Sequence, residues 1–326
     1  MDDKCATQFV GPVNEYDLGL SSDSGLQGGD SRPLYLIVVN GGIPGSMVRL
    51  KRDGTSIGRS STNDFRLHDP SISRNHAAIG ADSSGELWLS DLGSTNGTFL
   101  NGKKLGAHLA ARIRDGDRIQ FGKAVVVKFV CLDPSDEKFQ HEMFERTVRD
   151  PLTGLYNRSY FLDQLGAIAD TGSSRGLGLA VLLLDLDHFK SINDTHGHDA
   201  GDAVLREVAV VLRESTRSED LVARYGGEEF IVALPVSAPE QASERAERIR
   251  ANLAGRAILA GGTVLNVTAS FGLAYSPPGR GRIPTKLIST ADACLYQAKH
   301  LGRNRVAGQA GVELDAELAT PSSSER

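Results

Sequence analysis

Two adjacent carboxylates, Glu228 and Glu229, follow a pair of glycines in the stretch Arg224-Tyr225-Gly226-Gly227-Glu228-Glu229-Phe230. Apolar β-type runs flank this stretch. They predict a hairpin that turns at Gly226-Gly227, because a two-residue primed turn needs backbone angles that glycine accepts. Glycine also leaves room for a large ligand to approach the backbone. Neighbouring side chains of a strand point to opposite faces. The stretch therefore predicts an anionic functional site at the start of the second strand of the hairpin.

A second group of carboxylates, Asp185 and Asp187, lies where a buried strand is expected to end. The run Gly178–Leu184 is almost entirely apolar, as in a strand that is buried on both faces. Carboxylates at the end of such a strand are costly unless a positive charge compensates them. Oxygen ligands suit Mg²⁺, so the sequence predicts a metal site here. Asp187 is expected to turn the strand into the next loop and not to bind the metal.

The first third of the chain has a different pattern. Residues 34–131 contain many short β-type runs with turn residues between them, which predicts a β-sandwich. The expected strands are Leu34–Val39, Ser46–Leu50, Thr55–Gly58, Ala77–Gly80, Leu87–Ser90, Thr98–Leu100 and Ala124–Cys131. Three loops between them read Gly58-Arg59, Ser71-Ile72-Ser73-Arg74-Asn75-His76 and Ser94-Thr95-Asn96-Gly97-Thr98. Guanidinium groups, hydroxyls and an amide can together hold a phosphate group.

In the order and spacing of these three motifs, residues 34–131 resemble a forkhead-associated (FHA) domain, a reader of phosphothreonine peptides. The resemblance implies that the phosphate is bound by Arg59, Ser73 and Arg74. It also implies that Thr95 and Asn96 hold the backbone and the methyl group of the phosphothreonine. We expect His76 to brace the loop as a buried histidine, and Asn101 to be a turn residue.

Residues 132–149 are expected to form a linker helix. Pro134 is expected to end the sandwich, and Ser135 is the expected N-cap of a helix over Asp136–Val148, which has acidic residues in its first turn. A narrow apolar stripe is typical of a helix that contacts another surface, and a simple spacer is the alternative. The stripe is formed by Phe139, Met143 and Phe144.

Residues 150–308 alternate between helical and β-type patterns. Helices are expected at Ser159–Ala169, Gly201–Arg213, Pro239–Leu253 and Thr285–Leu301, and a further strand at Val264–Ser270. The last helix is expected to stop at Gly302. With the buried strand and the hairpin, this order predicts an α+β domain with a mostly antiparallel central sheet flanked by helices. Residues 1–33 and 309–326 lack a periodic pattern and are expected to be flexible tails.

In five separate motifs, residues 150–308 resemble a GGDEF domain, the catalytic module of diguanylate cyclases. The matching stretches are Asp150-Pro-Leu-Thr-Gly-Leu-Tyr-Asn-Arg, Asp185-Leu-Asp-His-Phe-Lys-Ser-Ile-Asn-Asp, Gly197-His-Asp-Ala-Gly-Asp, Gly226-Gly-Glu-Glu-Phe and Ala298-Lys-His-Leu-Gly-Arg-Asn-Arg. The hairpin has Glu228 where the family name has Asp, a variant that keeps the carboxylate.

The resemblance implies that two GTP molecules are joined head to tail into cyclic di-GMP, with release of two pyrophosphates. It implies that Mg²⁺ is held by Asp185, Glu229 and the Leu186 carbonyl, with two ions about 4 Å apart in a polymerase-like arrangement. Mn²⁺ is the alternative metal. Glu228 is expected to orient or deprotonate the attacking hydroxyl. One domain binds one GTP, so catalysis is expected only in a homodimer.

The resemblance also assigns the residues that bind GTP. The backbone around Phe189 and Lys190 is expected to assist, and the guanine edge is expected to be read by Asn193 and Asp202. Lys299 and Arg303 are expected to hold the terminal phosphates. These two cations stand four residues apart, close enough to share one helix face.

Five residues separate the stretch Arg217-Ser218-Glu219-Asp220 from Gly226. It resembles the RxxD motif for product inhibition at its usual spacing in the family. An arginine can read guanine O6 and N7 with two hydrogen bonds. Asp220 is expected to bond a neighbouring guanidinium or a guanine N–H, and Arg248 is expected to be a supporting arginine. A surface salt bridge is the alternative reading of this motif.

Composition restricts the class of protein. The 326 residues are 40% hydrophobic and 24% charged, without an apolar run of the length that spans a membrane. The start of the chain lacks the pattern of a signal peptide, and its three cysteines are scattered. A cytoplasmic, two-domain protein is expected, with neither a membrane nor a nucleic acid as a partner.

Charge is distributed unevenly along the chain. Residues 1–33 carry six acidic and two basic side chains, whereas residues 34–131 carry eight acidic and thirteen basic ones. A basic domain beside an acidic tail favours an anionic ligand for that domain. Thr7 is the only threonine of the tail, and Val10 stands at its +3 position. We therefore hypothesise that a Ser/Thr kinase phosphorylates Thr7 and that an FHA domain, in the same chain or in a partner, binds it.

Two other functions remain open at this stage. The chain can be a non-enzymatic cyclic di-GMP receptor that uses Arg217 and Asp220, or a phosphopeptide adaptor with a structural second domain.

Overall fold

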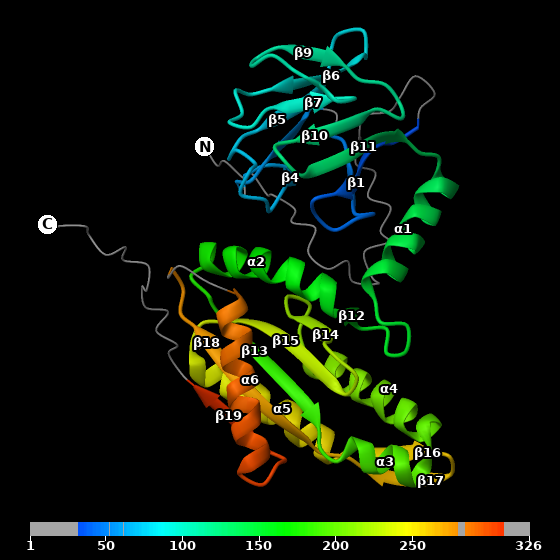
Figure 1. The fold of residues 1–326 in the computed structure, drawn as a ribbon, viewed down its shortest axis with the longest axis vertical. Coiled ribbons are helices and arrows are strands. Elements are labelled where there is room, and N and C mark those ends of the chain that lie inside the picture. The colour runs from blue at the N-terminus through cyan, green and yellow to red at the C-terminus, as the bar shows by residue number, and fades with distance from the viewer. Residues whose placement is uncertain (1–31, 52, 61, 280–283, 310–326) are drawn as a thin grey trace, which may run out of the picture. The chain divides into compact units, whose positions relative to one another are not determined.

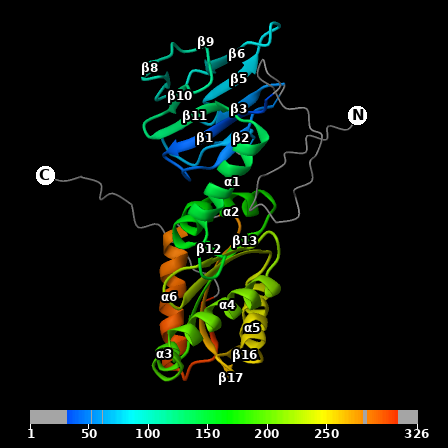
Figure 2. The ribbon, with the colours of Figure 1, turned by 90° about the vertical axis from the view of Figure 1, so that its right-hand side faces the viewer.

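The computed structural model describes residues 32–51, 53–60, 62–279 and 284–309. It divides into two compact units, Met1–Arg149 and Asp150–Arg326, which Figures 1 and 2 draw as ribbons. Their boundary coincides with the one expected between the linker and the second domain. Thr7 and nearly all of both expected tails lie outside the described residues. Of the helices in the described ranges, none has the length and apolar character needed to cross a membrane.

The first unit is a sandwich of two sheets, as predicted. The sheets have the strand orders β2-β1-β11-β10-β7-β8 and β4-β3-β5-β6-β9. The strands are β1 Leu34–Asn40, β2 Met47–Arg49, β3 Thr55–Gly58, β4 Phe65–Arg66, β5 Ala77–Ala81, β6 Leu87–Asp91, β7 Thr98–Leu100, β8 Lys103–Lys104, β9 Ala110–Arg112, β10 Arg118–Phe121 and β11 Val125–Cys131. Every expected strand is present to within one residue at each end. The sequence did not predict β4, β8, β9 and β10, whose short runs form strands only through pairing with their neighbours.

The two sheets of the sandwich enclose one apolar core. Side chains alternate between buried and half-buried along β6, so that Leu87, Leu89 and Asp91 point inward. Phe121 and Phe129, from the other sheet, are almost fully buried. The loops that connect the strands are therefore displayed on a rigid scaffold.

The linker helix, α1 Pro134–Val148, begins earlier than predicted. Pro134 does not end the sandwich before the helix but is the first residue of the helix, where its missing N–H costs nothing. The N-cap is Asp133 and not Ser135, because the Asp133 carboxylate accepts hydrogen bonds from the N–H groups of Ser135 and Asp136. Phe139 and Met143 are exposed in this structure.

The second unit is built on a six-stranded sheet in the order β12-β14-β15-β13-β18-β19. The three central pairings are antiparallel, and the two edge pairings, β12 with β14 and β18 with β19, are parallel. The strands are β12 Tyr156–Asn157, β13 Gly178–Leu186, β14 Leu221–Arg224, β15 Glu229–Val236, β18 Ala269–Ser276 and β19 Val306–Gln309. All nine residues of β13 are buried, as its apolar run predicted. The mostly antiparallel α+β fold is therefore confirmed.

Helices cover both faces of this sheet. Figure 2 shows α6 on one side of the sheet and α4 and α5 on the other. The helices are α2 Arg158–Ser174, α3 Phe189–His196, α4 His198–Ser215, α5 Pro239–Ala254 and α6 Pro284–His300. The sequence did not predict α3, which is eight residues long. The apolar residues of α4 and α5 join those of β13 and β15 in one core.

One predicted strand, Val264–Ser270, is wrong in its bounds. The chain instead forms β17 Thr263–Asn266, which pairs only with β16 Ala257–Ala260, and then enters the main sheet as β18. Gly272 in β18 lies directly under α6, since a Cβ atom there would stand 1.9 Å from the Ala291 carbonyl oxygen. This close approach sets α6, and the residues at its end, against the sheet.

Candidate active site

The hairpin forms at the predicted place but with a different turn. Strand β14 ends at Arg224 and β15 begins at Glu229, so the connection is four residues long. Neither Gly226 nor Gly227 has a positive φ. The predicted two-residue primed turn is therefore wrong, because a longer connection does not need left-handed backbone. A Cβ atom on Gly226 would stand 2.6 Å from Glu229 Oε2, whereas the space beside Gly227 is open.

Asp185 and Glu229 face each other across two neighbouring strands. They are direct partners in the register of β13 and β15. Like charges in this position destabilise a sheet unless a cation lies between them. The Lys299 ammonium lies 2.9 Å from Asp185 Oδ2 and supplies one positive charge. The structure thus brings together two residues that are 44 positions apart in the sequence.

Carboxylates outnumber ammonium groups at this site, and the pKa values of two of them are shifted. Burial raises the pKa of Glu229, the charge of Asp185 raises it further, and Lys299 opposes the rise. The pKa of Glu228 is also raised, by burial first and then by the charge of Asp185. In both residues, burial and the charge of Asp185 together outweigh the attraction of Lys299. A divalent cation would complete this compensation.

The donor set fits a divalent metal that is shared with a nucleotide. Asp185 and Glu229 supply carboxylate oxygens at the end of β13 and the start of β15, and Leu186 supplies a backbone carbonyl beside them. Within the described ranges, no three His, Cys, Asp or Glu side chains are gathered as a complete metal cage. Magnesium in nucleotide sites is held by one or two carboxylates together with substrate phosphates, so a complete protein cage is not required.

Asp187 has a structural role, as expected. It is 6% exposed and accepts hydrogen bonds from the hydroxyls of Thr268 and Ser270, each at 2.7 Å. Its Oδ2 also accepts from the Asn304 N–H at 3.0 Å. These bonds tie the end of β13 to β18 and to the turn after α6.

The residues expected to read guanine lie where α3 meets α4. Asn193 is on α3 and Asp202 is on α4, and the two helices are separated by Gly197, which has a φ of 83°. A Cβ atom on Gly201 would overlap Asn193 Oδ1, so glycine is needed for this close packing. Phe189 is buried and Lys190 is exposed at the start of α3. Both side chains are half-buried at this junction, and that they read the guanine edge stays a prediction.

The two cations expected to bind phosphates do not share a helix face. Lys299 is in the last turn of α6, which ends at His300. Arg303 follows the helix in left-handed backbone with a φ of 61°, after Gly302 at 110°. The helix stops at the predicted glycine. The expectation of a shared face is wrong because the helix has already ended at Arg303.

The loops of the first unit that are expected to bind phosphate are tied to one another. Ser73 Oγ accepts a hydrogen bond from the Thr95 N–H at 3.0 Å, and the Asn96 amide donates to the Ser71 carbonyl at 2.7 Å. The Arg59 N–H donates to the Ser73 carbonyl at 2.9 Å. Four of the five expected ligands thus lie in one network, and the side chain of Arg74 is exposed beside them.

Two further residues hold these loops, and only one of them, Gly58, belongs to a motif found in the sequence. Asn63 is 6% exposed, and its amide donates to the Arg74 carbonyl at 2.6 Å. Gly58 packs so closely on the same carbonyl that a Cβ atom would stand 2.3 Å from it. A lone asparagine in a polar loop gives no sequence signal for this role, whereas the Gly58-Arg59 pair does.

His76 braces the loops from inside the sandwich. It is fully buried, its Nδ1 accepts from the Ser73 N–H at 3.1 Å, and its Nε2 lies 3.2 Å from the Gly97 carbonyl. This pair of bonds assigns the proton to Nε2. Burial lowers the pKa of His76, although the Gly97 carbonyl and Asp91 act against this. Asn101, with a φ of 51°, is a turn residue that bonds Asp117 and Arg118.

We expect the sandwich to lose stability as the pH falls below about 6.5, the ordinary pKa of histidine. The unfolded chain takes up a proton on His76 that the folded chain resists, so the free energy of unfolding decreases by up to about 1.4 kcal/mol for each pH unit. Trp88 is the only tryptophan, so its fluorescence during urea unfolding follows this unit alone. His108→Asn, at an exposed site, should keep this slope. A flat profile between pH 7.5 and 5.5 would contradict the assignment.

Comparison with known proteins agrees with this geometry. A family model described as "Diguanylate cyclase, GGDEF domain" matches residues 147–305, and one described as "FHA domain" matches residues 55–122. The chain is 32% identical to the solved coiled coil and GGDEF domain of DgcB from Caulobacter crescentus in complex with c-di-GMP. That match covers 54% of this chain and 92% of the other, with a TM-score of 0.50. The chain belongs to the GGDEF family. An FHA domain precedes its GGDEF domain.

Two curated relatives match the GGDEF domain. The response regulator PleD of Caulobacter vibrioides is 46% identical over 168 residues, which is 51% of this chain and 37% of PleD. Diguanylate cyclase A of Treponema denticola is 40% identical over 169 residues, or 51% of this chain and 45% of that protein. This chain therefore spans less than half the length of these relatives.

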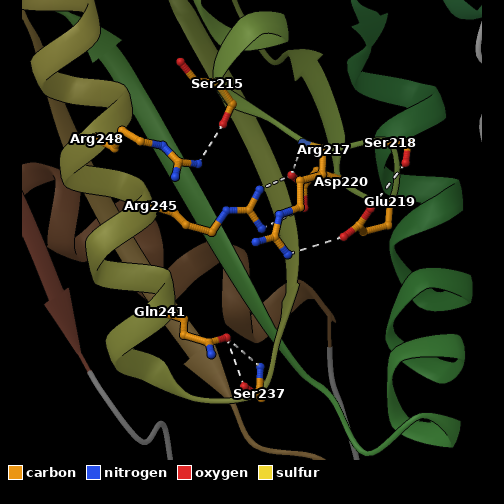
Figure 3. A network of polar contacts seen from close by, with 9 residues as sticks. All are labelled: Ser215, Arg217, Ser218, Glu219, Asp220, Ser237, Gln241, Arg245 and Arg248. Carbon is orange, nitrogen blue, oxygen red and sulfur yellow. Dashed lines mark hydrogen bonds and ion pairs between the residues drawn. The ribbon is translucent and has the colours of Figure 1, made fainter.

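The RxxD motif of the GGDEF domain forms a polar network beside α5 (Figure 3). Arg217 is largely exposed and lies 3.6 Å from Glu219, while its N–H donates to Asp220 at 2.6 Å. The Asp220 side chain is fully buried and forms an ion pair with Arg245, which the sequence analysis missed. Burial raises the pKa of Asp220, and Arg245 acts against this rise. Arg248 donates to the Ser215 carbonyl at 3.3 Å.

The motif is thus divided between two roles. Asp220 bonds a neighbouring guanidinium, which was one of the two expected possibilities, and this fixes the turn that carries Arg217. Arg217 itself keeps 65% of its side chain exposed, and Figure 3 shows Arg245 between Arg217 and Arg248. The only sequence signal for Arg245 was its position, one helical turn before another basic residue, Arg248.

Proposed function

We propose that this protein is a diguanylate cyclase that condenses two GTP molecules into cyclic di-GMP. The observation that carries the proposal is the pairing of Asp185 with Glu229 across β13 and β15, beside Lys299 and the glycines of the hairpin. Such a group of carboxylates suits phosphoryl transfer, where catalysis depends on positioning and charge neutralisation. The identity to named diguanylate cyclases supports the same activity.

Each residue of the site has a role in this reaction. Asp185, Glu229 and the Leu186 carbonyl would hold Mg²⁺, two ions per site, which would neutralise the charge that develops on the α-phosphate. Lys299 and Arg303 bind the terminal phosphates, and the start of α3 at Phe189 and Lys190 assists. Asn193 and Asp202 bond the guanine edge. Glu228 orients the attacking 3′-hydroxyl and accepts its proton.

The reaction needs a second copy of the chain. One GGDEF domain binds one GTP, and each 3′-hydroxyl attacks the α-phosphate of the other nucleotide. Two sites must therefore face each other in a homodimer. The open space beside Gly227 at the hairpin tip supports this arrangement, because no side chain obstructs the approach of a second nucleotide there.

Incubation of the purified chain with GTP and Mg²⁺, followed by chromatographic separation of nucleotides, tests the proposal. We expect cyclic di-GMP and pyrophosphate, at a rate that rises more steeply than in proportion to protein concentration. Absence of product at high protein concentration, with and without phosphopeptide, would refute it. Cyclic di-GMP binding without turnover would then support the receptor function, and phosphopeptide binding alone the adaptor function.

We propose that the FHA domain controls this activity by binding a phosphothreonine peptide. The network of Arg59, Ser73, Thr95 and Asn96, with Arg74 beside it, supports a phosphate ligand. The ligand we propose is Thr7 after phosphorylation by a Ser/Thr kinase. A synthetic peptide of residues 2–12 should bind when Thr7 is phosphorylated and should not bind otherwise. A Thr7→Ala chain that still responds to kinase treatment would overturn this assignment.

We expect cyclic di-GMP to inhibit its own synthesis at Arg217, Asp220 and Arg248. Arg217→Ala should leave turnover unchanged and raise the half-inhibitory product concentration at least about fivefold, since a bidentate arginine–guanine contact contributes about 1–3 kcal/mol. Initial rates at increasing added cyclic di-GMP measure this effect. Ser218→Ala, in the same turn, is the matched control and should behave like the unaltered chain. An equal inhibition curve for Arg217→Ala would show that the motif is structural.

A further inference from the structure

Arg224, the last residue of β14, contacts two parts of the GGDEF domain at once. Its Nη2 and Nε donate to the Gly227 carbonyl at 2.6 and 3.2 Å. Its Nη1 donates to Asp150 Oδ1 and Oδ2 at 3.2 and 3.1 Å. Both side chains of this ion pair are 17% exposed, so water screens it little. The planar guanidinium can make both contacts because its donors form a rigid fork.

Asp150 is itself held firmly at the entrance of the domain. Its Oδ1 accepts from the Thr153 N–H at 2.9 Å and from the Thr153 hydroxyl at 2.7 Å, and its own N–H donates to the Leu155 carbonyl at 2.8 Å. Burial raises the pKa of Asp150, but Thr153 and Arg224 outweigh burial and keep it below its usual value. Asp150 is the first residue of the second unit and follows Arg149, the C-cap of α1.

Gly227 is the residue just before the two hairpin carboxylates. Hydrogen bonds from the N–H groups of Tyr225 and Gly226 to the Glu229 carbonyl close the base of the loop at 2.8 and 3.2 Å, and the Glu228 carbonyl accepts from the Leu186 N–H at 3.3 Å. The Gly227 carbonyl lies at the tip, where the contact from Arg224 fixes its direction. The peptide group that this contact orients leads directly into Glu228.

We propose that Arg224 is a positioning residue that fixes the hairpin tip, with Glu228 and Glu229, relative to Asp150 at the entrance of the domain. The inference deepens the proposed diguanylate cyclase function and rests on it. A displacement of the chain at Arg149 and Asp150 reaches the hairpin through two hydrogen-bonded contacts. The reacting groups of phosphoryl transfer tolerate little misplacement, so such a displacement changes the rate.

The variant Asp150→Asn tests the contact between Asp150 and Arg224 while it keeps the hydrogen bonds from Thr153 to Asp150. An asparagine keeps Oδ1 for Thr153, but its amide group places a donor against the donor Nη1 of Arg224. We expect kcat for cyclic di-GMP formation to fall about tenfold or more, because misplacement by about 1 Å can cost a hundredfold. We expect the KM for GTP and the affinity for cyclic di-GMP at Arg217 to stay within about twofold, since neither site is altered.

Hydrogen exchange supplies a readout that does not depend on turnover. The backbone amides of Gly227 and Glu228 should exchange about tenfold faster in Asp150→Asn than in the unaltered chain, because the tip loses its anchor. Glu247→Gln, which removes a carboxylate from the exposed pair with Arg250, is the matched control and should change neither quantity. Thr153→Ser keeps the hydroxyl that bonds Asp150 and does not touch Arg224, so it should leave the hairpin amides unchanged.

Unchanged exchange at the hairpin in Asp150→Asn would overturn the inference, whatever happens to kcat. Unchanged kcat with faster exchange would overturn it as well, because the link would then hold the tip without serving catalysis. If the unaltered chain forms no cyclic di-GMP, the proposed function fails. The exchange measurement would then still decide whether Arg224 holds the tip.

Discussion

Replacement of Glu229 by alanine is expected to lower cyclic di-GMP formation by about a thousandfold or more, because it removes charge stabilisation of the transferring phosphoryl group. Glu229 faces Asp185 across the sheet, and the two would hold the metal together. The loss should appear in kcat, measured by nucleotide chromatography at saturating GTP and Mg²⁺. Glu229→Gln should be nearly as inactive, because it has the same size and shape but no charge.

A matched control separates this effect from a general loss of structure. Glu214→Ala removes an exposed carboxylate that lies 3.5 Å from Arg256, on the same domain but away from the hairpin. It should retain turnover. Both Glu229 variants should keep the far-ultraviolet circular dichroism of the unaltered chain. Retention of more than a tenth of the activity in Glu229→Ala would contradict the role of this residue as a metal ligand.

Replacement of Arg245 by alanine is expected to destabilise the GGDEF domain by about 3–5 kcal/mol, since it leaves the buried carboxylate of Asp220 without its partner. The Asp220 side chain has no exposure and that of Arg245 has 6%. Urea unfolding followed by far-ultraviolet circular dichroism measures this loss, because all described helices except α1 lie in the second unit. Trp88 fluorescence, which follows the FHA domain, should not change.

Two further variants test whether burial of the ion pair between Asp220 and Arg245 causes this loss of stability. Arg256→Ala breaks an ion pair that is 38% exposed on the arginine side, so it should cost no more than about 1 kcal/mol. The double variant Asp220→Leu with Arg245→Met removes both charges and should recover part of the lost stability, because an apolar pair of similar volume needs no compensation. A loss for Arg245→Ala as small as that for Arg256→Ala would contradict the buried ion pair.

Sequence patterns predicted most longer strands of the FHA domain, because short β-type runs were separated by turn residues. They predicted β13 from a different signal, since an uninterrupted apolar run is typical of a strand with both faces covered. Sequence patterns failed for strands that form only because they pair with a neighbouring strand. The two-residue strands β4 and β8 contain too few residues for a pattern. The predicted turn of the hairpin was wrong because glycines permit several turns, and neither Gly226 nor Gly227 adopts a positive φ.

The helix ends also differ in whether the local sequence or the fold decides them. The stop of α6 at Gly302 was predicted correctly from the glycine alone, since left-handed backbone at that point needs no distant partner. The start of α1 was misplaced because several residues of the segment 133–136 can cap a helix, and only the fold selects Asp133. Because α6 ends at His300, Arg303 does not lie on the same helix face as Lys299.

The sequence by itself determined the two families, the order of the domains and the residue types at each site. Those features are local, since motif spacing and the chemistry of carboxylates, glycines and guanidinium groups can be read along the chain. Only the tertiary structure decided which charges meet. Lys299 pairs with Asp185, Arg245 with Asp220, and Arg224 with Asp150. Each pair joins residues at least 25 positions apart. Sheet register and helix packing bring them together, and neither is encoded in a local pattern.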